Sequence, residues 1–232
     1  QQRPPVLKSG RDPLHALQLL VVGAIGSSES IGYTLYYTTN FIFTGLAVAV
    51  AFHAGLFNIG GEGQLLIGGM TALVVGFSFS GLPWVVHLPR PLRAGLIGGA
   101  GWGFLPGSMR ARTRAHGGST RIMLNYIAVL FVQFLLQTSF FQREGRNDPV
   151  SKSVEATAEL PQLLGWLNPA YRVNLGLIVA LIAAAVINWL LFRTTLGFEF
   201  RAVGANPAAA RYGGISVSRV YILVMIIAGA LA

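Results

Sequence analysis

The chain has 232 residues, of which 53% are hydrophobic and only 11% are charged, and its mean hydropathy is +0.59. An ordinary soluble domain carries about 25% charged residues, so this composition indicates an integral membrane protein. The net charge of +9 is confined to short segments between apolar stretches, which membrane topology explains without a nucleic-acid partner. The absence of cysteine excludes a disulfide framework and a thiolate metal site.

Apolar segments long enough to cross a bilayer, or nearly so, predict an all-α, polytopic transmembrane bundle that forms one domain over residues 1–232. They lie near residues 36–53, 63–80, 92–109, 122–141, 174–192 and 220–232. The last segment stops after 13 residues, too few for a hydrocarbon core of about 30 Å, so we expect a fragment. Residues 14–26 are apolar but short, and Gly23, Gly26 and the run 27–30 break them, so we expect an interfacial or re-entrant segment.

The segment 55–64, between the first two predicted spans, combines polar side chains with four glycines. Asn58, Glu62 and Gln64 need partners that lipid does not supply, and the glycines weaken a helix that would satisfy the backbone. We therefore expect this segment to face protein or a water-filled path, with Glu62 in a structural and gating role in preference to direct substrate binding. The alternative is an ordinary surface loop from which Glu62 reaches water by tilting.

Two later spans each carry a distinctive face. In the span 92–109 a glycine recurs every fourth residue, which predicts a smooth packing stripe for another helix; its members are Gly95, Gly99, Gly103 and Gly107. In the span 122–141 the amides of Asn125, Gln133 and Gln137 are eight and four residues apart and fall on one face. That face either lines a translocation path or hydrogen-bonds to a neighbouring helix, and the spacing alone does not distinguish these two roles.

The distribution of arginine predicts the orientation in the membrane. Residues 110–121 carry four arginines and no acid, and residues 193–219 carry four arginines and one acid, so both segments are expected in the cytoplasm. Residues 142–172 balance four basic against four acidic side chains and are expected outside. Counting spans backwards places residues 1–35 outside, which implies a missing preceding helix and therefore truncation at both ends.

A short helix is predicted inside the segment 193–219. Asn206 suits the N-cap, Pro207 suits the first helical position, and Gly213 or Gly214 suits the end. A helix of about six or seven residues is too short to be stable alone, so it needs a surface to dock against. That surface is either its own membrane domain or a separate cytoplasmic protein.

Several motifs together resemble those of permease subunits of bacterial ABC importers for nucleosides and simple sugars, within the branched-chain amino acid/ribose type permease family. The motifs are Gly45–Ala49, Gly55–Gln64, Met123–Tyr126, Arg201–Pro207 and Gly214–Ile215. The resemblance runs from about residue 14 to the end. One stretch departs from it, since family members usually carry a glutamate shortly before the Met-Leu-Asn-Tyr run, where this chain has Gly117-Gly118-Ser119-Thr120-Arg121.

The resemblance implies a multi-pass subunit of the bacterial cytoplasmic membrane that forms the translocation path for a nucleoside or simple sugar. It also implies a second permease subunit, cytoplasmic ABC ATPase subunits and an extracytoplasmic solute-binding protein as partners. ATP hydrolysis is expected on the ATPase, because this chain has no Gly-rich phosphate loop ending in Gly-Lys-Ser or Gly-Lys-Thr. No enzymatic activity, cofactor or metal is therefore expected. The segment 193–219 becomes the ATPase-coupling loop, with candidate residues Arg201, Gly204, Asn206, Pro207, Arg211, Gly213 and Gly214.

Two other function classes are weaker matches to the sequence. An ATPase-independent channel or secondary carrier for a small polar solute would more often show paired intramembrane acids or bases, whereas Glu62 stands alone. A membrane enzyme needs a cluster of reactive or metal-binding side chains. The four histidines are scattered, with no carboxylate at ligand spacing; they are His15, His53, His87 and His116.

Overall fold

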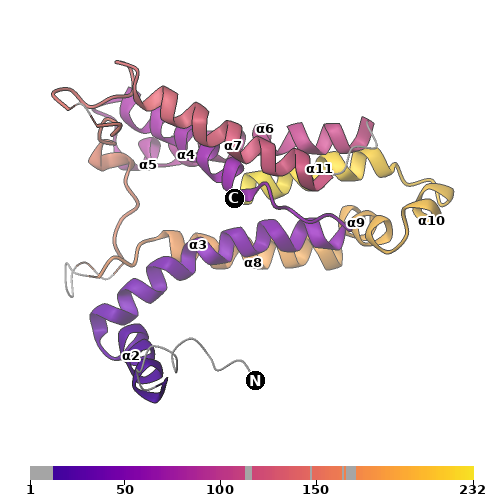
Figure 1. Cartoon of the computed structure of the whole chain (residues 1–232), viewed down its shortest axis with the longest axis horizontal. Helices are drawn as coiled ribbons and strands as arrows, with labels where there is room; N and C mark the ends of the chain where they lie inside the picture. The colour runs from indigo at the N-terminus through magenta and orange to yellow at the C-terminus, as the bar shows by residue number, and fades with distance from the viewer. Residues whose placement is uncertain (1–12, 113–116, 147, 164, 166–170) are drawn as a thin grey trace. The chain divides into compact units, whose positions relative to one another are not determined.

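The computed structural model describes residues 13–112, 117–146, 148–163, 165 and 171–232 (Figure 1). Within them the chain forms helices joined by turns, with two isolated β-bridges and no longer strand, which confirms the predicted all-α class. The chain divides into two compact units, one from residues 1–41 and 160–181 and the other from residues 42–159 and 182–232.

The first unit contains α2 (Pro13–Ile25) and the beginning of α3 (Ser28–His53). Ser27 caps α3, because its hydroxyl accepts a hydrogen bond of 3.0 Å from the backbone N–H of Ser30. Glu29 lies in the first turn, where its charge complements the helix dipole. The predicted break at this polar run is confirmed, because α2 ends at Ile25 and a new helix begins at Ser28. Helix α3 thus begins before residue 36, and the start of the membrane span near that residue stays a prediction.

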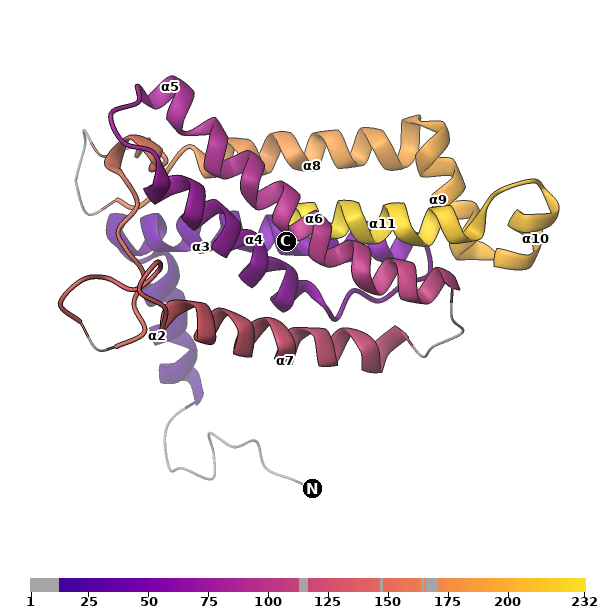
Figure 2. The same ribbon diagram turned by 90° about the horizontal axis from the view of Figure 1, so that it is seen from above.

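The second unit contains the remaining helices and the parts of α3 and α8 that follow residues 41 and 181. These helices are α4 (Gly61–Ser78), α5 (Trp84–His87), α6 (Pro89–Arg112), α7 (Gly117–Leu136), the 3₁₀ helix η1 (Ala156–Ala158), α9 (Thr195–Ala205), α10 (Pro207–Tyr212) and α11 (Val217–Leu231), with α8 spanning Gly176–Arg193. Helix α6 lies against both α4 and α11 (Figure 2). The hydrophobic core of the second unit contains residues of α3, α8, α9 and α11, including the fully buried side chains of Val50, Phe200 and Met225.

The glycine stripe of α6 lies between two helices. A Cβ atom on Gly99 or Gly103 would collide with a backbone carbonyl oxygen of α11, so only glycine permits this approach. Gly107 also faces α11, whereas Gly95 faces α4. Close backbone approach supplies dispersion contacts in a membrane, where the hydrophobic effect does not drive helices together.

Helix α7 ends at Leu136, short of the predicted end near residue 141. The hydroxyl of Thr138 donates to a carbonyl three residues earlier, and the backbone N–H of Gln137 also turns to a carbonyl three residues earlier. These bonds replace the next helical turn. Gln137 thus lies just beyond the end of α7, and its place on one face with Asn125 and Gln133 stays a prediction.

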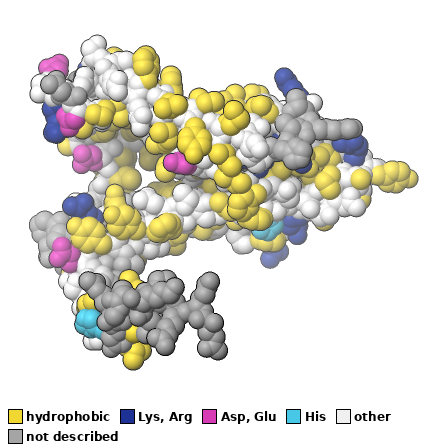
Figure 3. Space-filling view, viewed as in Figure 1, with side chains coloured by type: hydrophobic (Ala, Val, Ile, Leu, Met, Phe, Trp, Pro, Cys, Tyr) yellow, Lys and Arg dark blue, Asp and Glu magenta, His cyan; other side chains and the backbone are white. Residues whose placement is uncertain are grey.

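Three helices of the described chain are long and apolar enough to cross a membrane: α3, α7 from Gly118, and α8. Hydrophobic side chains are spread along the visible helix surfaces (Figure 3), as a lipid environment requires. The predicted spans near 63–80, 92–109 and 220–232 correspond to α4, α6 and α11, and their crossing of the bilayer stays a prediction.

The close contact between the glycine stripe of α6 and α11 predicts the effect of a larger side chain on stability. Replacing Gly103 with Ala should destabilise the full-length protein by about 1–3 kcal/mol, because the added methyl group overpacks the contact with α11. The control is Gly101→Ala on the same helix, where a Cβ meets nothing within 4 Å. Thermal unfolding in detergent measures both, and equal melting temperatures would contradict this account of the packing.

Candidate functional site

Residues 54–64 join α3 to α4 and include the first turn of α4; we call them the polar connection. Gly55 adopts a φ of 70°, a left-handed conformation that favours glycine. Helix α9 approaches the same point, since a Cβ on Gly55 would lie 3.4 Å from the Cα of Gly204. The polar connection therefore starts in direct contact with the segment that the sequence assigned to ATPase coupling.

Asn58 and Gln64 form a reciprocal amide pair. The Asn58 Nδ2 donates to Gln64 Oε1 at 2.8 Å, and the Gln64 Nε2 donates to Asn58 Oδ1 at 3.3 Å. The two side chains are 5% and 1% exposed. Because buried amides need partners, this pairing stabilises the observed conformation of the polar connection. In this conformation the two amides hydrogen-bond to each other, so these groups are not free to bind a solute.

Asn125 of α7 clamps the polar connection from the side. Its Nδ2 donates to the carbonyl of Ile59, and its Oδ1 accepts from the backbone N–H of Gly63, both at 2.9 Å. The N-cap residue of α4 is Gly60, which has no side chain to satisfy the orphan N–H groups of the first turn. Asn125 supplies that acceptor from another helix. For this residue, hydrogen bonding to a neighbouring segment is what the structure shows.

Arg121, one turn before Asn125, was not singled out from the sequence. Its Nη1 donates to the carbonyl of Phe57, and the side chain is only 4% exposed. Its Nε and Nη2 are buried and have no hydrogen-bond partner in the described chain. The available signal was a lone arginine in register with Asn125 at the start of an apolar run.

The other predicted path residues, Glu62, Gln133 and Gln137, have exposed side chains. Glu62 is exposed in the first turn of α4, where its charge complements the helix dipole. Gln133 is exposed on α7, and Gln137 is exposed beyond its end. Three of the predicted residues are thus brought together by the structure: Asn58, Gln64 and Asn125.

The helix signals around Asn206 are confirmed. Its side-chain oxygen accepts hydrogen bonds of 3.0 and 3.1 Å from two backbone N–H groups in the first turn of α10. Pro207 occupies the first helical position and Gly213 the C-cap. Gly214 then has a φ of 86°, which turns the chain towards α11.

The segment 193–219 contains a second helix, α9, which the sequence patterns did not predict. Thr194 caps it by accepting a hydrogen bond of 3.1 Å from the Gly197 N–H. Phe200 and Val203 bury its inner face, so tertiary packing stabilises this helix. Arg201 lies on the outside, 5.3 Å from a ring centroid of α8. A Cβ on Gly204 would collide with a carbonyl at the end of α3.

Helix α10 has one face on its own domain and one face in the open. Ala210 is buried, whereas Pro207, Arg211 and Tyr212 are exposed. Tyr212 is 97% exposed, which is unusual for a large aromatic side chain. Tyr212 is not among the residues predicted from the sequence, although its position beside Arg211 in the capped helix was a signal.

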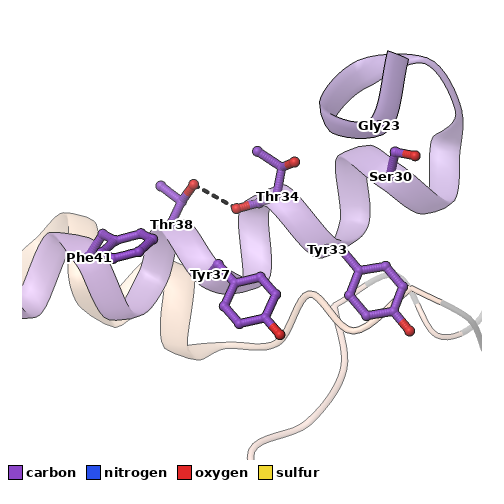
Figure 4. Close-up of a pocket in the computed structure, with 7 residues that line it drawn as sticks. All are labelled: Gly23, Ser30, Tyr33, Thr34, Tyr37, Thr38 and Phe41. Atoms are coloured by element: carbon purple, nitrogen blue, oxygen red, sulfur yellow. Dashed lines mark hydrogen bonds between the residues drawn. The ribbon is translucent and has the colours of Figure 1, made fainter. Parts of the chain in front are cut away.

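A groove of about 560 Å³ runs along α3 within the first unit (Figure 4). The hydroxyls of Thr34 and Thr38 donate to backbone carbonyls, which leaves an aromatic surface on this face. The groove is lined by Gly23, Ser30, Tyr33, Thr34, Tyr37, Thr38 and Phe41. Hydroxyl and aromatic residues three and four apart mark this face in the sequence.

Other polar groups serve local structure. His87 is fully buried, with its Nδ1 2.7 Å from the Thr157 hydroxyl. In the segment after α7, the hydrogen bond from Arg146 lowers the pKa of the Asp148 carboxyl, and both side chains are exposed. Within the described residues, no three His, Cys, Asp or Glu side chains are grouped so as to hold a metal ion.

Comparison with known proteins places the chain in a family. Residues 30–232 match the family described as the permease component of the branched-chain amino acid transport system. The chain belongs to this permease family. It is a multi-pass membrane protein, as its apolar helices indicate. The permease matches no solved structure.

Named relatives of the permease are ABC transporter permeases. It is 37% identical to the nucleoside ABC transporter permease protein NupB of Lactococcus lactis over 98% of this chain and 63% of the relative. It is 38% identical to the guanosine ABC transporter permease protein NupP of Bacillus subtilis, over 98% and 64%. It is 34% identical to the glucose ABC transporter permease protein TsgB13 of Haloferax volcanii, over 95% and 59%. The chain thus spans about three fifths of the length of these relatives.

The clamp predicts that Asn125→Ala destabilises the full-length permease by about 1–3 kcal/mol, because two backbone groups lose their partner. Gln133→Ala, an exposed amide on the same helix, is the control and should cost nothing. Unfolding titrations in mixed micelles measure the difference. Equal effects of the two substitutions would show that Asn125 is not a clamp.

The reciprocal hydrogen bonds between Asn58 and Gln64 predict that substitutions at these two residues have non-additive effects on the free energy of unfolding. Each single change to Leu should cost about 1–3 kcal/mol, because the remaining buried amide is unpaired. The double variant should lose less than the sum of the two, as a double-mutant cycle of unfolding free energies would reveal. Additive losses would mean that the two side chains act independently.

Proposed function

We propose that this chain is part of the permease subunit of an ABC importer and contributes to the translocation path of a nucleoside. The observation that carries the proposal is the similarity of nearly the whole chain to permeases named for nucleosides and guanosine, at 37% and 38% identity. A simple sugar is the second substrate class, supported by the 34% identity to a permease named for glucose. The cytoplasmic membrane of a bacterium is the proposed location.

In this proposal a separate ATPase drives transport by binding α10. The exposed Pro207, Arg211 and Tyr212 would insert into a groove of the ATPase, while buried Ala210 holds α10 to the permease. Tyrosine and arginine are the side chains that most often anchor protein interfaces. The arginine-rich composition of residues 193–219 supports a cytoplasmic position for this surface.

The contact between α9 and the polar connection would transmit the movement. Gly204 lies against the end of α3 and against Gly55, with no side chain between the backbones. A displacement of α9 therefore pushes directly on the point where the polar connection begins. The Asn58–Gln64 pair and the Asn125 clamp would open in response, and Glu62 would contribute to gating.

Three further partners complete the proposed transporter. A second permease subunit would enclose the path, ABC ATPase subunits would supply ATP hydrolysis, and an extracytoplasmic solute-binding protein would deliver the solute. The test reconstitutes the full-length permease with candidate partners of these three kinds in vesicles with ATP inside. Nucleoside uptake that requires both ATP and the solute-binding protein supports the proposal. Uptake without ATP would favour a channel or secondary carrier.

The docking surface predicts that Tyr212→Ala reduces recovery of the ATPase with the affinity-purified permease by at least about tenfold, the effect of losing a strong interface anchor. Tyr126→Ala on α7, which removes another exposed tyrosine, is the control. Quantitative mass spectrometry of the purified complexes measures both. Full ATPase recovery with Tyr212→Ala and with residues 206–213 deleted would contradict the coupling role.

A further inference from the structure

Arg121 presents an unfinished set of hydrogen bonds. One terminal nitrogen, Nη1, binds the carbonyl of Phe57, while Nε and Nη2 are buried without partners. These two atoms form one edge of the guanidinium group, and that edge makes two parallel hydrogen bonds to a planar group with two acceptors. The two unpaired donors therefore form an edge of Arg121 that can bind a planar group with two acceptors.

The described chain supplies nothing to complete this edge. No carboxylate within the described residues forms an ion pair with Arg121. Arginine does not lose its proton in proteins, so the buried donors stay charged and costly. A second buried donor without a partner, the indole Nε1 of Trp102, lies 2.8 Å from the Cβ position of Gly63, beside the same first turn of α4. A ligand that fits here must offer acceptors.

We infer that Arg121 is a specificity-determining residue that binds the N7 and O6 edge of a 6-oxopurine nucleoside during transport. This inference rests on the proposed nucleoside substrate. Guanine and hypoxanthine present two acceptors on that edge, and arginine pairs with them in the commonest specific base contact known from DNA. Adenine presents one acceptor and one donor, and a donor facing Arg121 is repelled.

The polar connection contacts Arg121 beside this edge. The Phe57 carbonyl accepts a hydrogen bond from Nη1, and Gly60 lies against the Arg121 stem. Because Nε and Nη2 are buried in the present conformation, a solute can pair with them only after the surrounding segments rearrange. A solute that pairs with Arg121 then offsets part of the cost of breaking the closed contacts, so the binding favours the open state for the correct base.

The test measures initial uptake of guanosine, inosine, adenosine and uridine by the reconstituted full-length complex. The wild-type complex should prefer guanosine and inosine to adenosine by about tenfold in kcat/KM, the scale of one bidentate base contact. Guanosine should also compete for uptake about tenfold better than 7-deazaguanosine, which lacks the N7 acceptor. Equal uptake of all four nucleosides, or equal competition, would overturn the inference.

Two variants separate recognition from structure. Arg121→Lys keeps a charge and a donor for the Phe57 carbonyl but lacks the two-donor edge, so it should assemble normally and lose the preference. Arg121→Gln should do the same, whereas the control Arg112→Gln, an exposed arginine at the end of α6, should keep the preference. An equal loss of uptake for every nucleoside would assign Arg121 a structural role only.

The remaining outcomes distinguish this inference from the proposed function. Competition by inorganic phosphate or guanosine monophosphate that exceeds competition by guanosine would assign the edge to an oxyanion and overturn the base contact. Loss of the partner permease from the purified Arg121→Lys complex would assign it to a protein carboxylate. Unselective nucleoside uptake overturns the inference alone, whereas the absence of any nucleoside uptake overturns the proposed substrate as well.

Discussion

The non-helical backbone between α3 and α4 needs hydrogen-bond partners, and the surrounding structure depends on how they are supplied. Where a membrane helix stops, backbone groups lose their partners, and hydrocarbon supplies none. Here a buried amide pair, Asn58 with Gln64, holds the polar connection internally, and Asn125 satisfies a backbone carbonyl and a backbone N–H within it. The non-helical backbone at this point is possible because α7 completes its hydrogen bonds. Any movement of the connection must break these bonds and replace them.

The absence of a side chain at Gly63 allows α7 to approach α4 closely enough for Asn125 to bind the polar connection. A Cβ on Gly63 would meet the Trp102 ring, the Asn125 amide and the Ala128 methyl group, so three helices converge on one position without a side chain. The stripe on α6 acts in the same way towards α11. Close packing and polar recognition therefore depend on each other, because the Asn125 bonds of 2.9 Å require the backbones to approach closely.

The segment 193–219 and the polar connection are in contact within the second unit. Helix α10 follows α9 directly, and α9 contacts the backbone where the polar connection starts. In the proposed mechanism, a force applied to the exposed face of α10 would reach the Asn58–Gln64 pair through α9. The buried Arg121 would then convert an opening of the connection into a change in available donors, which links the proposed motor input to solute recognition.

The sequence by itself determined the helical class, the capped helix at Asn206, the glycine stripe of α6 and the polarity of residues 55–64, because periodicity, capping chemistry and the cost of polar groups in lipid are local properties. It also carried the motifs of the permease family. Tertiary structure alone decided that Asn125 clamps another segment, that Arg121 is buried, and that α9 is a helix, since each depends on contacts with residues distant in sequence. It also decided the ends of α3 and α7, where a serine cap extends one helix and a threonine hydroxyl ends the other, because local hydrogen bonds compete there with hydrophobic periodicity.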